Sequence, residues 1–262
     1  MLDFGFYNMD CMEGMKEFPD QFFDLAIVNP PYGINVGQSS MGAGGGVAPH
    51  RNRSAANLRG GQMKIGGAKP FGSKSGGAVP RGSIQVGGGS VCLPKIYKAF
   101  DDSHTPDAEY FKELSRVAKK TIIWGGNYFL DNLGETECLI IWDKRRRGLN
   151  FADCEIAWTN IKEPCRIFEW KWNGMLQEDM KNKEYRIHPT QKPVALYRWL
   201  LEHYAKEGDK ILDTHVGSAS SLIACREMGF KYVGFEIDED YFNEAKKRLD
   251  QAENQVNIFD LL

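Results

Sequence analysis

The tetrapeptide Asn29-Pro30-Pro31-Tyr32 follows an apolar run at 23–28 and contains the residue types needed to activate an aromatic amine. The lone pair of such an amine is delocalised into its ring, so the nitrogen attacks poorly until hydrogen bonds to its two hydrogens draw it toward tetrahedral geometry. The Asn29 side-chain oxygen and the Pro30 carbonyl are suitable acceptors, which the prolines hold stiffly. Tyr32 offers a face on which a base turned out of a duplex can stack. The alternative interpretation is a strand-ending turn with a packed tyrosine.

A second group of polar residues surrounds two predicted strands near the end of the sequence. Asp213 ends one strand and precedes Gly217 and Ser218, whose amides at a helix N-terminus can hold an anion. Glu236 ends the next strand, where a carboxylate can accept hydrogen bonds from both hydroxyls of a ribose. This pair predicts an adenosine-containing cofactor, and the lack of a G-x-G-x-x-G motif argues against a dinucleotide. The alternative is a helix cap at Asp213 and a surface charge at Glu236.

An α/β sheet must position these groups, and the hydrophobic periodicity predicts one. Strands are expected at 2–7, 23–28, 121–124, 138–142, 154–158, 210–213 and 232–236. Helices are expected at 11–18, 106–117 and 193–204, after the loop at 214–218, and from Asp240, with Thr190 as a possible cap of the third. The fold class is therefore a mixed, mainly parallel sheet with an antiparallel hairpin at one edge. Ligands of such sheets bind beyond the carboxyl ends of the strands, where the polar motifs lie.

Composition limits the class of protein. A chain of 262 residues fits one catalytic α/β domain, 1–262, with insertions. The charged fraction of 26% is ordinary, and no apolar run approaches the roughly 18 residues of a membrane span. The N-terminus lacks a signal-peptide pattern, which predicts a cytoplasmic protein without a membrane partner. Six cysteines without a C-x-x-C pair argue against a disulfide framework and a metal site.

Charge is divided unevenly along the chain. The glycine-rich segment 33–100 contains no acidic residue, and the stretch from Leu25 to Phe100 has nine basic ones, which leaves a charge of −11 on the rest. We expect this segment to be a clamp on DNA phosphates, with further contacts from the opposite side. The expected contacts are Arg51, Arg53, Arg59, Lys64, Lys69, Lys74 and Arg81, and then Arg145, Arg146 and Arg147. The alternative is a solvated loop. A loop at 166–187 is the candidate recognition region, and its shortness suggests a homodimer.

Together these motifs resemble the amino-methylating DNA methyltransferases, in the permuted motif order of the beta group. The resemblance covers nearly the whole chain outside the glycine-rich segment. Asn29 to Tyr32 resembles the family's catalytic motif D/N/S-P-P-Y. Segment 188–193, H-P-T-Q-K-P, resembles a motif of the family that binds the cofactor. Segment 213–220, D-T-H-V-G-S-A-S, resembles the family's loop D-P-F-x-G-S-G-T. Segments 124–129 and 142–144 resemble the middle strands, and Glu236 resembles the ribose-binding acid.

The resemblance implies a Rossmann-like methyltransferase fold, S-adenosylmethionine as cofactor and double-stranded DNA as substrate. It also implies DNA methylation of the kind found in restriction–modification, in a bacterial or phage-infected cell. The catalytic residues would be Asn29, Pro30, Pro31 and Tyr32. The implied cofactor-binding residues are Asp10, Cys11, His188, Thr190, Lys192, Pro193, Asp213, Thr214, Gly217, Ser218, Ser220 and Glu236.

The cofactor loop departs from the family pattern. Thr214, His215 and Ala219 replace Pro, Phe and Gly, which puts cofactor affinity in question, and we expect His215 to pack over the cofactor. One alternative is therefore a nucleic-acid-binding relative that has lost cofactor binding and catalysis. Another is a protein glutamine methyltransferase, but there the cofactor loop precedes N-P-P-Y. Cytosine's amine and RNA remain open as targets, while the tetrapeptide favours adenine.

Overall fold

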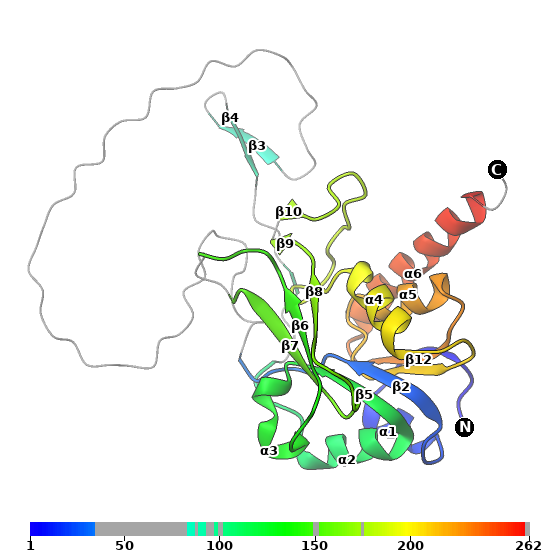
Figure 1. Ribbon diagram of the computed structural model, residues 1–262. Coiled ribbons are helices and arrows are strands. Elements are labelled where there is room, and N and C mark those ends of the chain that lie inside the picture. Colours follow the sequence, from blue (N-terminus) through cyan, green and yellow to red (C-terminus); the bar gives the residue numbers. More distant parts are fainter. Residues whose placement is uncertain are drawn as a thin grey trace, which may run out of the picture. The chain divides into compact units, whose positions relative to one another are not determined.

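The computed structural model describes residues 1–34, 83–86, 89–92, 97–98, 102–148, 152–173 and 176–259 (Figure 1). The chain divides into two compact units. The first consists of Met1–Ser39 and Tyr97–Leu262, and the second of Ser40–Ile96. In the second unit the structure describes an antiparallel hairpin of β3 (Ser83–Val86) and β4 (Gly89–Cys92). All elements named below belong to the first unit.

The first unit is built on an eight-stranded sheet in the order β1-β12-β11-β2-β5-β7-β6-β8. The strands are β1 (Gly5–Asn8), β2 (Phe23–Val28), β5 (Ala118–Trp124), β6 (Leu139–Asp143), β7 (Cys154–Thr159), β8 (Arg166–Glu169), β11 (Lys210–Asp213) and β12 (Lys231–Glu236). The first five strands in this order, β1, β12, β11, β2 and β5, run parallel. Strand β7 is antiparallel to both its neighbours, β5 and β6. A small separate ladder pairs β9 (Trp172–Asn173) with β10 (Leu176–Gln177).

Helices cover both faces of this sheet (Figure 1). On one face lie α4 (Val194–Tyr204), α5 (Ser220–Glu227) and α6 (Glu239–Phe259), and on the other α1 (Cys11–Lys16) and α2 (Ala108–Val117). The alternation along β2 explains why two layers are needed, because Leu25 and Ile27 pack into one buried cluster while Ala26 and Val28 pack into the other. A strand that is buried on both faces has a continuous run of apolar residues, as 25–28 has in this strand.

The predicted fold class is confirmed, with differences in detail. β1 begins at Gly5 instead of Leu2, and the antiparallel pair β6–β7 lies one strand inside the edge. The outermost strand, β8, begins the segment 166–187 that was expected to be a loop. The expectation that Thr190 caps α4 is wrong, because Pro193 is the N-cap residue and Glu184 Oε1 accepts from the first helical amide, that of Val194, at 2.9 Å. The hydroxyl of Thr190 instead contacts His188 Nδ1 at 2.9 Å.

Candidate active site

The predicted motif residues meet at one edge of the sheet. Because β1, β12, β11, β2 and β5 are parallel neighbours, their carboxyl ends lie side by side. Asp10 follows β1, Glu236 ends β12, Asp213 ends β11 and Asn29 follows β2. Residues that are separated along the chain are thereby placed at adjacent positions, as expected for an open α/β sheet.

The tetrapeptide at the end of β2 forms its own hydrogen-bonded unit. Pro30 is buried, and the Tyr32 hydroxyl donates to Asn29 Oδ1 at 2.7 Å. This bond fixes the direction of the Asn29 amide oxygen, which retains a second lone pair for another donor. Burial raises the pKa of Tyr32 well above its usual value, so the hydroxyl remains a proton donor at neutral pH.

A buried carboxylate holds the backbone beyond the prolines. Asp102 is 5% exposed, and its Oδ1 accepts hydrogen bonds from the amides of Tyr32 at 2.7 Å and Gly33 at 3.0 Å. These bonds turn the chain after Tyr32 and keep the tyrosine ring over the end of β5. Sequence reasoning did not identify Asp102, because it lies 70 positions from Tyr32 outside any motif.

Next to the Tyr32 hydroxyl lies a buried network of one carboxylate and two lysine ammonium groups. Glu155 on β7 pairs through Oε1 with Lys144 and through Oε2 with Lys192, and the two lysines are 7% and 3% exposed. The Lys192 ammonium also donates to the Tyr32 hydroxyl at 3.3 Å. A continuous chain of hydrogen bonds therefore runs from Glu155 through Lys192 and Tyr32 to Asn29.

Electrostatics keep this network charged. Burial by itself raises the pKa of Glu155, but Lys192 and Lys144 outweigh burial and hold the pKa at about 2. Burial lowers the pKa of Lys144, against the attraction of Glu155. Lys192 was predicted to bind cofactor, and its ammonium is engaged on the side of Tyr32 and Glu155. Its cofactor role stays a prediction.

A hollow of about 110 Å³ lies at the carboxyl ends of β1, β11 and β12. It is lined by Met9, Asp10, Cys11, Thr214, His215, Phe235, Glu236 and Ile237, which include four of the predicted cofactor residues. Glu236 is partly engaged inside the protein, since Oε2 accepts from the Gly217 amide at 2.8 Å and Oε1 from the Asp238 amide at 3.0 Å. Each carboxylate oxygen keeps a lone pair for a ligand hydroxyl. Burial raises the pKa of Glu236.

Asp213 organises the loop after β11. It is 2% exposed and accepts hydrogen bonds from the His215 amide at 3.0 Å and the Ser221 hydroxyl at 2.5 Å. Burial raises the pKa of Asp213 to about 6. The carboxylate therefore shapes the loop from within.

The predicted loops 188–193 and 213–220 contact each other. Gly217 has a φ of 55°, and a Cβ there would lie 3.8 Å from the His188 ring. Arg248 on α6 fixes the same region from outside, because it donates to the Ser218 carbonyl, the Ser220 hydroxyl and Glu184. Cofactor roles for His188, Thr190, Pro193, Ser218 and Ser220 remain predictions.

His215 occupies the place where the family pattern has a phenylalanine. Its Nδ1 lies 2.9 Å from Thr214 Oγ1, which in turn lies 2.7 Å from the Tyr110 hydroxyl. The imidazole packs edge-on against Tyr110, with 5.4 Å between ring centroids. Burial lowers the pKa of His215 to about 4, so the ring is neutral at pH 7. It lines the hollow, as expected for a residue that packs over a ligand.

Residues 142–247 match a family model described as DNA methylase. Over this segment the chain is similar to DNA methylases. Over 79 residues the chain is 38% identical to the type II methyltransferase M.HpaI from Haemophilus parainfluenzae, covering 30% of this chain and 25% of that protein. Over 69 residues it is 38% identical to the DNA adenine methyltransferase YhdJ from Escherichia coli (strain K12), covering 26% and 24%. The chain thus matches about a quarter of the length of these relatives.

The fold agrees with that of solved methyltransferases. The PvuII DNA methyltransferase, described as cytosine-N4-specific, superimposes with a TM-score of 0.50 at 12% identity, covering 98% of this chain and 93% of that chain. At this identity the likeness concerns the fold alone. The methylase segment, 142–247, contains Glu155, the loop 188–193, Asp213 and Glu236, whereas Asn29 lies outside it.

The structure describes only some of the predicted DNA contacts. Arg51, Arg53, Arg59, Lys64, Lys69, Lys74 and Arg81 lie outside the described residues. Arg145 pairs with Glu169 and Glu178, Arg147 pairs with Asp143, and Arg146 donates to the Ala152 carbonyl. The pairs of Arg145 are exposed and therefore weak, so a phosphate could replace them. DNA contact by these arginines stays a prediction.

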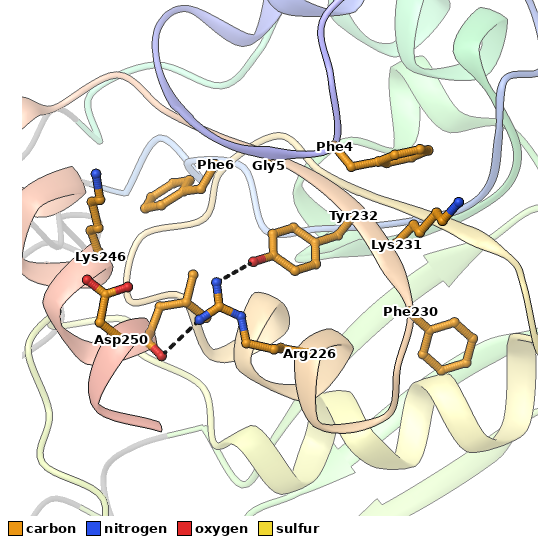
Figure 2. Close-up of a pocket in the computed structure, with 10 residues that line it drawn as sticks. Phe4, Gly5, Phe6, Arg226, Phe230, Lys231, Tyr232, Lys246 and Asp250 are labelled. Atoms are coloured by element: carbon orange, nitrogen blue, oxygen red, sulfur yellow. Dashed lines mark hydrogen bonds between the residues drawn. The ribbon is translucent and has the colours of Figure 1, made fainter. Parts of the chain in front are cut away.

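A larger hollow of about 340 Å³ lies at the opposite end of the eight-stranded sheet (Figure 2). Phe4, Gly5, Lys231 and Tyr232, at the amino ends of β1 and β12, line it together with α5 and α6. Arg226 crosses it toward the Tyr232 hydroxyl and the Leu249 carbonyl. Its position places it away from every predicted catalytic residue. Among the described residues no cluster of metal-binding side chains occurs, and no helix is long and apolar enough to cross a membrane.

Proposed function

We propose that this chain transfers a methyl group from S-adenosylmethionine to the exocyclic amine of adenine in double-stranded DNA. The observation that carries the proposal is the Asn29 amide oxygen, which the Tyr32 hydroxyl fixes at the same sheet edge as the hollow beside Glu236. An acceptor for an amine and a place for an adenosine are thus neighbours.

Asn29 and Pro30 act on the amine. The Asn29 oxygen accepts one amine hydrogen and the Pro30 carbonyl the other, which localises the nitrogen lone pair. The nitrogen would then attack the methyl carbon, the S–C bond would break with its electron pair left on sulfur, and the methylated amine would release one proton to water. The cofactor supplies the electrophilic methyl group. No covalent nucleophile of the protein is required.

The residues of the hollow suit the cofactor's adenosine. At about 110 Å³ it is smaller than a complete ligand pocket of roughly 300 Å³ or more, so it suits the purine end alone. Glu236 offers acceptors for the ribose hydroxyls, and His215 and Ile237 offer apolar surface. The loop 213–220 and His188 are then left for the methionine end.

Adenine is preferred over cytosine on two grounds. The tetrapeptide Asn29 to Tyr32 favours adenine, and the relative YhdJ is named as a DNA adenine methyltransferase. The PvuII enzyme, named as cytosine-N4-specific, is similar in fold only. Double-stranded DNA as partner, its grip by segment 33–100 and a homodimer are part of the same proposal.

The experiment is incubation of the purified chain with methyl-labelled cofactor and mixed-sequence DNA, followed by nucleoside analysis. N6-methyladenine is the expected product. N4-methylcytosine as the product would show that the target is cytosine and not adenine. Asn29→Ala should lower kcat by about 100- to 1,000-fold or more while cofactor binding stays within a few-fold. Asn29→Asp, which keeps an acceptor oxygen, is the matched control and should retain measurable transfer. Substantial turnover by the alanine variant would contradict the role of Asn29.

A further inference from the structure

An exposed tyrosine covers the ring on which the base is proposed to stack. Tyr128, at the end of the short 3-10 helix Gly126–Tyr128, lies nearly parallel to Tyr32, with 5.0 Å between centroids and 15° between planes. Tyr128 is 45% exposed. Its ring is therefore accessible to a ligand that approaches from solvent.

The other neighbours of Tyr32 are fixed parts of the fold. Gly125 approaches so closely that a Cβ there would lie 2.2 Å from the Tyr32 ring, and Phe129 is 2% exposed and edge-on to it. Lys192 Nζ is 3.3 Å from the hydroxyl but 5.8 Å from the ring centroid, so it lies beyond the hydroxyl and not over a face. Of these contacts, Tyr128 alone is an exposed side chain.

We infer that Tyr128 is the second wall of the base-binding slot, so that the target base enters between the rings of Tyr32 and Tyr128. The inference rests on the proposed function and adds a substrate-contacting residue to it. An inserted base needs about 7 Å between the two rings, because each stacked pair is separated by about 3.5 Å. The centroid distance of 5.0 Å is an upper limit for the present spacing between the two ring planes, so Tyr128 must move outward by at least about 2 Å.

The backbone around Tyr128 restricts this movement to the side chain. A Cβ on Gly126 would lie 2.4 Å from Trp158 Cβ, so this part of the turn is packed tightly against β7. On the other side, Phe129 is buried in the cluster that includes Phe111 and Val28. The ring of Tyr128 can swing while its Cα stays in place, which gives a slot that opens without refolding of the turn.

The slot takes a flat aromatic heterocycle and does not distinguish among bases. Stacking uses the π-face that every base has, so Tyr128 contributes affinity, whereas Asn29 and Pro30 select the amine. Truncation of a stacking aromatic weakens binding of a base by about 5- to 150-fold. We expect this loss in kcat/KM for DNA, with cofactor binding unchanged.

The test compares the full-length chain with Tyr128→Phe, Tyr128→Ala and Leu130→Ala, using a duplex that contains a methylation site found for the parent. Leu130 is a neighbouring exposed residue and controls for damage to the turn. Tyr128→Phe and Leu130→Ala should keep the parental kcat/KM, and Tyr128→Ala should lose about 5- to 150-fold at an unchanged Tm. With 2-aminopurine at the target position, bound Tyr128→Ala should fluoresce more brightly than the parent, because one quenching ring is gone.

The outcomes separate the two proposals. A parent that methylates DNA, together with a Tyr128→Ala variant of parental kcat/KM and parental 2-aminopurine emission, would overturn the role of Tyr128 alone. A Tyr128→Ala variant that acts faster than the parent would also overturn it, since Tyr128 would then be an obstacle. A parent that labels no DNA would instead refute the proposed function.

Discussion

Replacement of Glu155 by glutamine is the perturbation that the buried network makes most informative. The substitution keeps the shape of the side chain but removes the charge between Lys144 and Lys192. Both lysines then remain buried as cations without their counterion. Loss of one partner of a buried pair is costly because the remaining charge is uncompensated.

The expected magnitude follows from the pKa of Glu155. The folded protein holds it at about 2, against an ordinary value of 4.5. A difference of this size corresponds to roughly 3 kcal/mol of the free energy of unfolding, which agrees with the range of about 3–5 kcal/mol for breaking a buried pair. We expect Glu155→Gln to lower the free energy of unfolding by about 3 kcal/mol at pH 7.

The effect should depend on pH in a defined direction. Because folding lowers the pKa of Glu155, its contribution is complete above pH 4.5 and is lost as pH falls toward 2. The glutamine variant has no such titration. The difference between parent and variant should therefore shrink by about 2 kcal/mol between pH 7 and pH 3.

Urea denaturation at the two pH values measures both quantities. Glu109→Gln is the matched control, since Glu109 pairs with Lys112 on an exposed surface and its loss should cost less than about 1 kcal/mol. The reasoning fails if Glu155→Gln is as stable as the parent at pH 7. It fails equally if the deficit is the same at pH 3 as at pH 7.

Two further predictions concern the cofactor hollow and the turn below Tyr32. Glu236→Ala should raise the cofactor Kd, measured by calorimetry, by about 5- to 150-fold. Glu239→Ala is the control, because Glu239 is exposed and its replacement should leave the Kd unchanged. Equal Kd values for the two variants would refute a contact between Glu236 and the ribose. Gly125→Ala should destabilise the protein more than Gly134→Ala, because both have a φ near 71° but only the former brings a Cβ within 2.2 Å of Tyr32. Equal shifts in Tm for the two variants would show that the clash with Tyr32 is relieved at little cost in free energy.

The sequence predicted the residues that directly follow strands. Asn29, Asp213 and Glu236 could be placed because an apolar run that stops at a polar residue marks the end of a strand. Parallel pairing then brings such ends together. The tetrapeptide Asn29 to Tyr32 and the hollow therefore lie at the strand ends that the pattern predicted.

The supporting residues could not be predicted in the same way. Glu155 lies in a correctly predicted strand, but the pattern of that strand did not single out its carboxylate. Its partner Lys192 is 37 positions away, and no local pattern states which way that side chain points. Strand β8 was missed because R-I-F-E is short and places only two apolar residues between two charged ones. These features depend on packing between distant elements.

The position of β1 has a consequence for the way this chain is made. β1 is an edge strand whose partner in the described sheet is β12, and the Asn8–Glu236 contact spans 228 positions. On the ribosome, β1 therefore cannot pair with β12 until Glu236 has been synthesised. Such long-range closure makes folding slow and leaves the waiting strand open to wrong partners. The hollow that brings Asp10 to Glu236 forms where these two strands meet, so we expect it to form only after β12 has emerged.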